Sequence, residues 1–411
     1  MRTMKGIPWR MGLVGMVAGA ILAVASGAEA QLTGTCSDEF NCRIGTDRPA
    51  SLLIYPKLQF STADVTDTIV QLVNAGERRS IDVLCFYVNA NGHCTNNDEV
   101  CNPSEADQCD PGATCEPGWV ETDFRLTLTK RQPISWRISE GLPFLPCDAN
   151  APDPEVCTSD DQGNPIFNNG SIPLVPEDPF TGELKCVQID EADVPVEFND
   201  LMGSATIIRA IQPGDVDVNK QNAIGVQAIP GRLNEDGILC LGGGGSDECP
   251  NGAEYVGCPQ TLIMDHFFDD AIVDGSPVET RLTLVPCAED FETQSTLFTR
   301  TTVQFLVFNE FEQRFSTSFR ISCFEDRQIS DIDTRLGDFD DSASIFNIGV
   351  QGTVSGQTRI RGVSSGNEAH GLLGQFTEYH SCAEGVDGIC TATTNLHTQG
   401  RRDLSDLIIL R

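Results

Sequence analysis

The chain has 411 residues and is strongly acidic, with 27 Lys and Arg against 60 Asp and Glu and a formal net charge of −33. Such a polyanion repels nucleic acid and anionic membrane surfaces, so the composition excludes nucleic acid as an expected partner. The length allows two or three domains that can bury their own cores.

Residues 1–30 have the pattern of an export signal. A basic start precedes an apolar run rich in Gly and Ala, and Ala28 and Ala30 place small residues where a signal peptidase reads. An uncleaved anchor is the alternative, but the small-residue end favours cleavage before Gln31. No later apolar run reaches the about 18 residues that span a bilayer. We expect a secreted, periplasmic or cell-surface protein with no transmembrane segment after signal cleavage.

All 17 cysteines lie beyond the expected signal. In an exported chain this usage predicts a disulfide framework, and the odd number leaves at least one thiol unpaired. We expect the unpaired residue to be Cys85, because it lies in an apolar run and resembles a small core side chain.

Four cysteines fall in one short polar stretch, residues 94–115. Their spacing, C-x6-C-x7-C-x5-C, lacks the close C-x2-C pairs that structural zinc sites use. Disulfides are therefore favoured over zinc, and the sequence does not choose among the possible pairings. The predicted disulfide cysteines are Cys94, Cys101, Cys109 and Cys115.

The apolar pattern throughout is that of short β-strands. Residues 81–88 are apolar on both faces, as in a strand covered on both sides. We interpret residues 66–89 as a hairpin that turns at residues 74–80. Residues 124–129 alternate apolar and polar side chains, so the four-cysteine stretch is predicted to be an insertion between two strands of one sheet.

Short strands recur in the second half, and no long amphipathic helix is evident; the C-terminal 401–411 fits either a helix or a last strand. The predicted fold is all-β, with two antiparallel β-sandwich domains and long disulfide-stapled loops. The expected organisation is as follows: signal peptide 1–30, N-terminal lead 31–48, first sandwich 49–145 with the Cys-rich insertion 90–119, linker or long loop 146–180, second sandwich 181–395 with an irregular insertion 230–275, and C-terminal tail 396–411.

The segment TDTIVQLVNAGERRSIDVLCFYVN, residues 66–89, resembles the immunoglobulin-like β-sandwich repeats of exported bacterial surface proteins. The resemblance implies an immunoglobulin-like fold and a location outside the cytoplasm, and it transfers no functional residue. The Cys…Trp…Cys spacing of true immunoglobulin domains is missing, because Trp136 follows Cys85 with no second core cysteine at the required distance.

Clustered carboxylates give the most specific candidate site. Hard cations such as calcium take several oxygen ligands, which acidic turns supply. One acidic cluster lies within residues 331–341, and a second lies within residues 215–219. Neither cluster fits the helix-flanked calcium loop, so a solvated acidic loop is the alternative. The candidate calcium ligands are Asp331, Asp333, Asp338 and Asp340.

Catalytic motifs are weak. Residues 362–366 match G-x-S-x-G formally, but the following pattern is a loop and a strand rather than the helix that a nucleophile elbow requires. We therefore expect a non-catalytic structural or binding protein with no cofactor except possible calcium, and a protein or glycan partner outside the cell. The alternatives are a calcium-dependent adhesion or glycan-binding module and an exported hydrolase on a β scaffold.

Overall fold

The computed structural model describes residues 41–102, 108–142, 172–234, 236–243, 249–250, 252–273, 275–295, 299–332, 344–363, 370–382 and 388–410. The predicted signal peptide, most of the N-terminal lead and most of the predicted linker lie outside these residues. In the described part of the chain the helices are limited to α1 (Ile348–Gln351) and the 3₁₀ turn η2 (Ile329–Ile332). The all-β prediction is confirmed. No described helix has the length and apolar character needed to cross a membrane.

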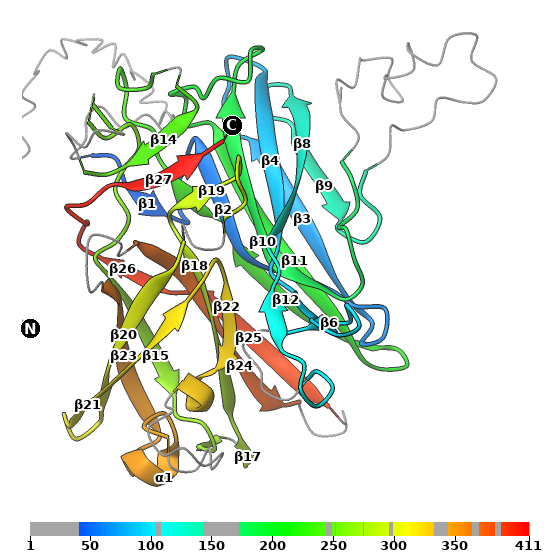
Figure 1. The fold of residues 1–411 in the computed structure, drawn as a ribbon, viewed down its shortest axis with the longest axis vertical. Helices are drawn as coiled ribbons and strands as arrows, with labels where there is room; N and C mark the ends of the chain where they lie inside the picture. The colour runs from blue at the N-terminus through cyan, green and yellow to red at the C-terminus, as the bar shows by residue number, and fades with distance from the viewer. Residues whose placement is uncertain are drawn as a thin grey trace, which may run out of the picture. The chain divides into compact units, whose positions relative to one another are not determined.

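Two antiparallel sheets form the first sandwich (Figure 1). The six-stranded sheet runs, in order, β1 (Ile44–Gly45), β13 (Ile224–Val226), β2 (Leu52–Phe60), β10 (Phe180–Ile189), β4 (Ile81–Asn89) and β8 (Val120–Leu128). The four-stranded sheet runs β12 (Asp215–Asn222), β11 (Leu201–Gln212), β3 (Thr66–Asn74) and β9 (Pro133–Arg137). Apolar side chains from both sheets meet in one core.

The segment predicted as a hairpin is instead a crossover between these two sheets. β3 pairs with β11 and β9, whereas β4 pairs with β10 and β8. The burial patterns give the physical reason. β3 alternates buried and half-buried residues, which suits a sheet with one outward face, while β4 is buried along nearly its whole length, as its two apolar faces predict.

A small third layer covers the other face of the six-stranded sheet. It consists of β14 (Ile238–Leu241), β27 (Asp406–Ile409) and β19 (Glu289–Asp290), and we call it the cap sheet. Its side chains share a second core with β2, β4 and β10. The C-terminal segment therefore ends in a strand, which decides between the two alternatives that the sequence left open.

The second sandwich is built from two further antiparallel sheets around its own core. One contains β21 (Arg314–Ile321), β20 (Thr301–Asn309), β23 (Ser355–Val363), β15 (Thr261–Phe267) and β26 (His397–Gln399). The other contains β22 (Glu325–Gln328), β18 (Glu279–Pro286), β24 (Leu372–Ser381) and β25 (Ile389–Asn395). A separate two-stranded ribbon joins β16 (Ile272–Val273) and β17 (Ser276–Pro277).

Strand pairing draws the division between the sandwiches at a different place from the sequence prediction. Strands β10 to β13, residues 180–226, hydrogen-bond into the sheets of β2, β3 and β4. The sequence prediction assigned residues 181–395 to the second sandwich because it took the Pro-rich segment before them as a linker. The strands on either side of that segment belong to the same sandwich, because β9 lies in its four-stranded sheet and β10 in its six-stranded sheet.

The cysteine-rich insertion lies between β4 and β8, which are neighbours in one sheet. It contains a small sheet of β5 (Gly92–Cys94), β6 (Val100–Cys101) and β7 (Cys115–Pro117). Two disulfides hold this sheet, Cys94–Cys109 and Cys101–Cys115. The insertion buries few apolar side chains, so covalent links take the place of a core.

Cys85 is not the unpaired cysteine, so that prediction is wrong. It pairs with Cys186, directly opposite on β10, inside the core of the first sandwich. The apolar surroundings that suggested a free thiol are equally suited to a buried disulfide. Further disulfides join Cys240–Cys249, Cys258–Cys287 and Cys382–Cys390.

Replacing both Cys85 and Cys186 with Ala should lower the free energy of unfolding by about 4 kcal/mol, because this disulfide closes a long loop of the unfolded chain. The sequence separation is 101 residues, against 8 for Cys382–Cys390. The matched double Ala variant at Cys382 and Cys390 should lose only about 2 kcal/mol. Urea unfolding measures both. Equal losses would show that loop closure does not set the effect.

Candidate functional site

A hollow of about 580 Å³ lies between the first sandwich and the second. Its walls come from β2, β10 and β11 on one side and from β18, β22 and β24 on the other. A neighbouring hollow of about 570 Å³ shares five of its residues: Gln59, Thr181, Arg209, Tyr379 and Ile389. We call the two hollows together the cleft. Each hollow has the volume of a small-molecule site.

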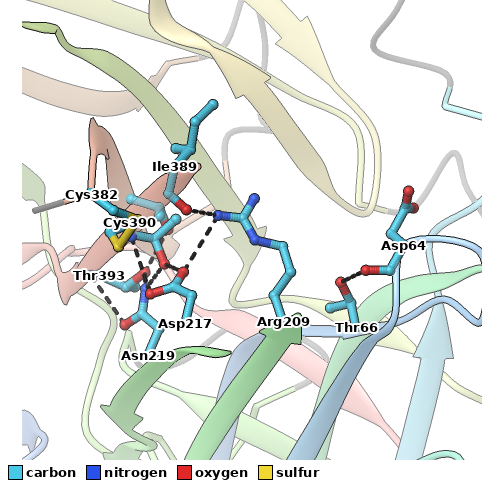
Figure 2. Close-up of polar contacts among 11 residues, drawn as sticks. Asp64, Thr66, Arg209, Asp217, Asn219, Cys382, Ile389, Cys390 and Thr393 are labelled. Atoms are coloured by element: carbon cyan, nitrogen blue, oxygen red, sulfur yellow. Dashed lines mark hydrogen bonds and ion pairs between the residues drawn. A yellow bond between two sulfur atoms is a disulfide. The ribbon is translucent and has the colours of Figure 1, made fainter. Parts of the chain in front are cut away.

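Arg209 stands where the two hollows meet. It projects from β11, opposite Asp217 of β12 in the strand register. Its Nη2 donates to the carbonyl oxygen of Ile389 at 2.6 Å and lies 3.5 Å from the Asp217 carboxylate (Figure 2). The Tyr379 ring centre lies 5.9 Å from the guanidinium carbon. Among the described residues, Nε and Nη1 have no protein partner, so they remain available to a ligand.

A row of polar contacts fixes the wall that Arg209 reaches. Thr391 donates its hydroxyl and its backbone N–H to the Asp217 carboxylate, at 2.5 and 3.3 Å. Asn219 donates to the Thr393 hydroxyl at 2.6 Å and accepts from the Thr393 N–H at 3.2 Å (Figure 2). Asp217 and Asn219 belong to the second acidic cluster of the sequence. The structure gives them buried contacts between the two sandwiches.

Asp326, which lines the cleft, belongs to a buried ion pair between the sandwiches. Lys57 of β2 donates to both carboxylate oxygens of Asp326 on β22, each at 2.9 Å. Arg281 and the Thr283 hydroxyl also contact this carboxylate. Burial raises the pKa of Asp326, but Lys57 and Arg281 outweigh burial, so its pKa lies below the ordinary range.

Four arginines line the cleft in a chain whose net charge is −33. Arg281 is paired with Asp326, and Arg327 donates to Glu325 at 2.8 Å. Arg320 is exposed at the rim. Four acidic residues also line the two hollows, so the cleft places arginine donors among acidic side chains; these are Asp64, Glu279, Glu325 and Asp326. The four arginines are Arg209, Arg281, Arg320 and Arg327.

Cys323 is the free cysteine among the described residues, and it lines the cleft. Its backbone is left-handed, with φ of 61°, an unusual conformation for a residue other than Gly. The Thr299 hydroxyl lies 3.1 Å from its sulfur. Burial is the main cause that raises the pKa of Cys323 to about 12. A thiol with this pKa is a poor nucleophile at neutral pH.

The calcium prediction is not carried further by the described residues. Asp331 is exposed within η2, and Asp333, Asp338 and Asp340 lie outside the described residues. The G-x-S-x-G match begins at the end of β23, and its serine also lies outside them. The cleft residues were missed by sequence reasoning because they come from distant strands and share no motif.

Comparison of the chain with protein-family models and with curated proteins gave no match.

Iodoacetamide should leave Cys323 unlabelled in the native protein at pH 8, because the thiol is 3% exposed and its pKa is raised to about 12. Denaturant without reductant should make it reactive while the disulfides stay closed. Mass spectrometry of the digested protein identifies the labelled residue. Fast native labelling of Cys323 would contradict the burial argument.

Replacing Lys57 with Met should lower the free energy of unfolding by about 3 to 5 kcal/mol at pH 7, because it leaves the Asp326 carboxylate buried with less compensation. In the wild type, the stability that the Asp326 carboxylate gains from Lys57 is fully present above the unfolded pKa of Asp326. It is lost as the pH falls through the folded pKa of Asp326, which is lower. The difference between variant and wild type should therefore shrink in acid. Thermal melting from pH 7 to pH 3 measures this.

The matched control is Arg131→Met, which removes an exposed pair with Glu77. It should cost less than about 1 kcal/mol at any of these pH values. A loss at Lys57 no larger than the loss at Arg131 would contradict the prediction.

Proposed function

We propose that the protein is an exported, non-catalytic binding protein that holds an acidic glycan in the cleft between its two sandwiches. The observation that carries this proposal is Arg209, which presents unpaired N–H donors at the centre of the cleft beside an aromatic ring. A guanidinium fork matches a carboxylate geometrically, and such charge-assisted bonds are the strong ones.

The remaining cleft chemistry supports a sugar over a peptide. The walls carry neutral hydrogen-bonding side chains such as Gln59 and Thr181, which suit hydroxyl groups, and Tyr379 offers a ring face. A peptide-binding groove would need several apolar pockets for side chains. The proposed location outside the cytoplasm agrees with the disulfides of the structure.

Binding is favoured over hydrolysis by the state of two of the acidic side chains that line the cleft. Asp326 is engaged by Lys57 and Arg281, and Glu325 by Arg327. None of the described residues lining the cleft is a histidine. General acid–base chemistry needs a group poised near the working pH, whereas the pKa of Asp326 is held low.

An array of acidic and neutral oligosaccharides tests the proposal, followed by calorimetric titration of the ligands that bind. We expect uronate-bearing or sialylated chains to bind and neutral chains of equal length not to bind. Arg209→Gln should weaken binding at least tenfold, as expected for the loss of a charge-assisted hydrogen bond worth about 1.5 to 3 kcal/mol.

The matched control is Arg78→Gln, which removes the same charge from an exposed loop outside the cleft. It should leave the affinity within about twofold, since exposed charges at a distance are screened by salt. Equal weakening by both variants would indicate a general charge effect. Failure of every acidic glycan to bind would overturn the proposed function.

A further inference from the structure

Two charged side chains stand in the middle of an apolar sheet face. Glu183 and Lys185 lie two residues apart on β10, so both point toward the cap sheet. In the strand register, Lys185 lies between Ile54 of β2 and Phe86 of β4. Both charged side chains are 1% exposed. Water therefore cannot solvate their charges.

The third member of the cluster comes from the cap sheet. Glu289 on β19 is fully buried, and its Oε2 contacts the Lys185 Nζ. The same Nζ donates to Glu183 Oε1 at 2.8 Å. Within the described structure, the other oxygen of each carboxyl group receives no hydrogen bond from a donor. One amine thus faces two carboxyl groups in a closed apolar site.

The charges of this triad do not balance if all three groups ionise. Burial, and then repulsion from Glu183, raise the pKa of Glu289 well above its ordinary value. Burial also raises the pKa of Glu183, although Lys185 opposes the shift. Burial lowers the pKa of Lys185, but its two carboxyl partners raise it by more, so this pKa lies above its ordinary value. The directions of these shifts favour a protonated Glu289 beside the Lys185 ammonium and the Glu183 carboxylate.

We propose that Lys185 and Glu289 condense to an intramolecular amide bond, with Glu183 as the proton acceptor. Lys185 is already in contact with the carboxyl group that it would attack, and the neighbouring strands hold both side chains in place. This is the arrangement in which proximity replaces activation of the acid.

The step balances without any other reactant. The ammonium gives one proton to Glu183, which removes two opposite charges from an apolar site. The resulting amine attacks the carboxyl carbon of Glu289, and the carbon–hydroxyl bond of the acid breaks. The amine loses a second proton, which leaves with that hydroxyl group as water. The products are a secondary amide, one water molecule and protonated Glu183, and no group is oxidised or reduced.

The second buried lysine provides an internal control. Lys57 is as deeply buried as Lys185, but its partner Asp326 has a lowered pKa and remains a carboxylate. The additional charged group on Asp326 is the cation Arg281 rather than a second carboxyl. A carboxylate is a poor acceptor for an amine, and among the described residues Asp326 is the carboxyl group that contacts Lys57. This pair stays ionic.

Mass spectrometry of the exported wild-type protein tests the proposal directly. After unfolding, reduction and alkylation, the intact mass should be one water molecule below the mass of the same chain without the bond. Trypsin should not cleave after Lys185, and the digest should contain one branched peptide that joins Lys185 to Glu289. Lys57 and Asp326 should appear in ordinary linear peptides.

A full intact mass with free Lys185 would overturn the proposal, and so would a bond between Lys185 and Glu183 or one at Lys57. This measurement needs no variant, so it stands even if substitutions in the core prevent folding. Glu183→Gln keeps the size of the side chain but removes the proton acceptor. If this variant folds, it should show the full mass. A folded Glu183→Gln protein that still loses water would refute the role of Glu183.

Discussion

The structure depends on the burial of β10 on both of its faces. This strand lies between β2 and β4 in the six-stranded sheet, with the sandwich core on one side and the cap sheet on the other. Leu184 and Cys186 fill the first side without difficulty. On the second side Glu183 and Lys185 must find partners, because an unpaired charge in such a site costs several kcal/mol. The cap sheet supplies Glu289, so the pairing of Glu289 with Lys185 helps to fix the position of the cap sheet.

The neighbourhood of β19 is correspondingly well fixed for a strand of two residues. Cys287, two positions before Glu289, is held to Cys258 by a disulfide. Phe291, two positions after it, stacks on Phe86 of β4 with ring centres 4.1 Å apart. β19 also pairs with the final strand, β27. A covalent link, a ring stack and a strand pairing thus bracket the acidic residue of the cap sheet that meets Lys185.

Local pattern predicted the strands well and their surroundings poorly. Alternation along β3 and the two apolar faces of β4 follow from the sequence, as does the insertion between β4 and β8. Glu183 and Lys185 also alternate with apolar neighbours, which is the pattern of a half-exposed strand, so nothing local signalled their burial. Asp217 looked like a solvated or cation-binding acid for the same reason. Side-chain period fixes which residues share a face, whereas the cover on that face comes from residues far away in the sequence.

Three contacts of the first sandwich with its neighbouring layers place a cation on the first sandwich. Lys57, Lys185 and Arg209 project from β2, β10 and β11, and each has an acceptor on the second sandwich or the cap sheet. A chain with net charge −33 repels itself, so cations at its internal boundaries offset that repulsion where the layers meet. Buried ion pairs add little net stability compared with apolar packing, but they penalise any other register of the layers. Where this cationic boundary opens to solvent at Arg209, the acceptor shell is incomplete, and the same donors that hold the layers together become available to an anion from outside.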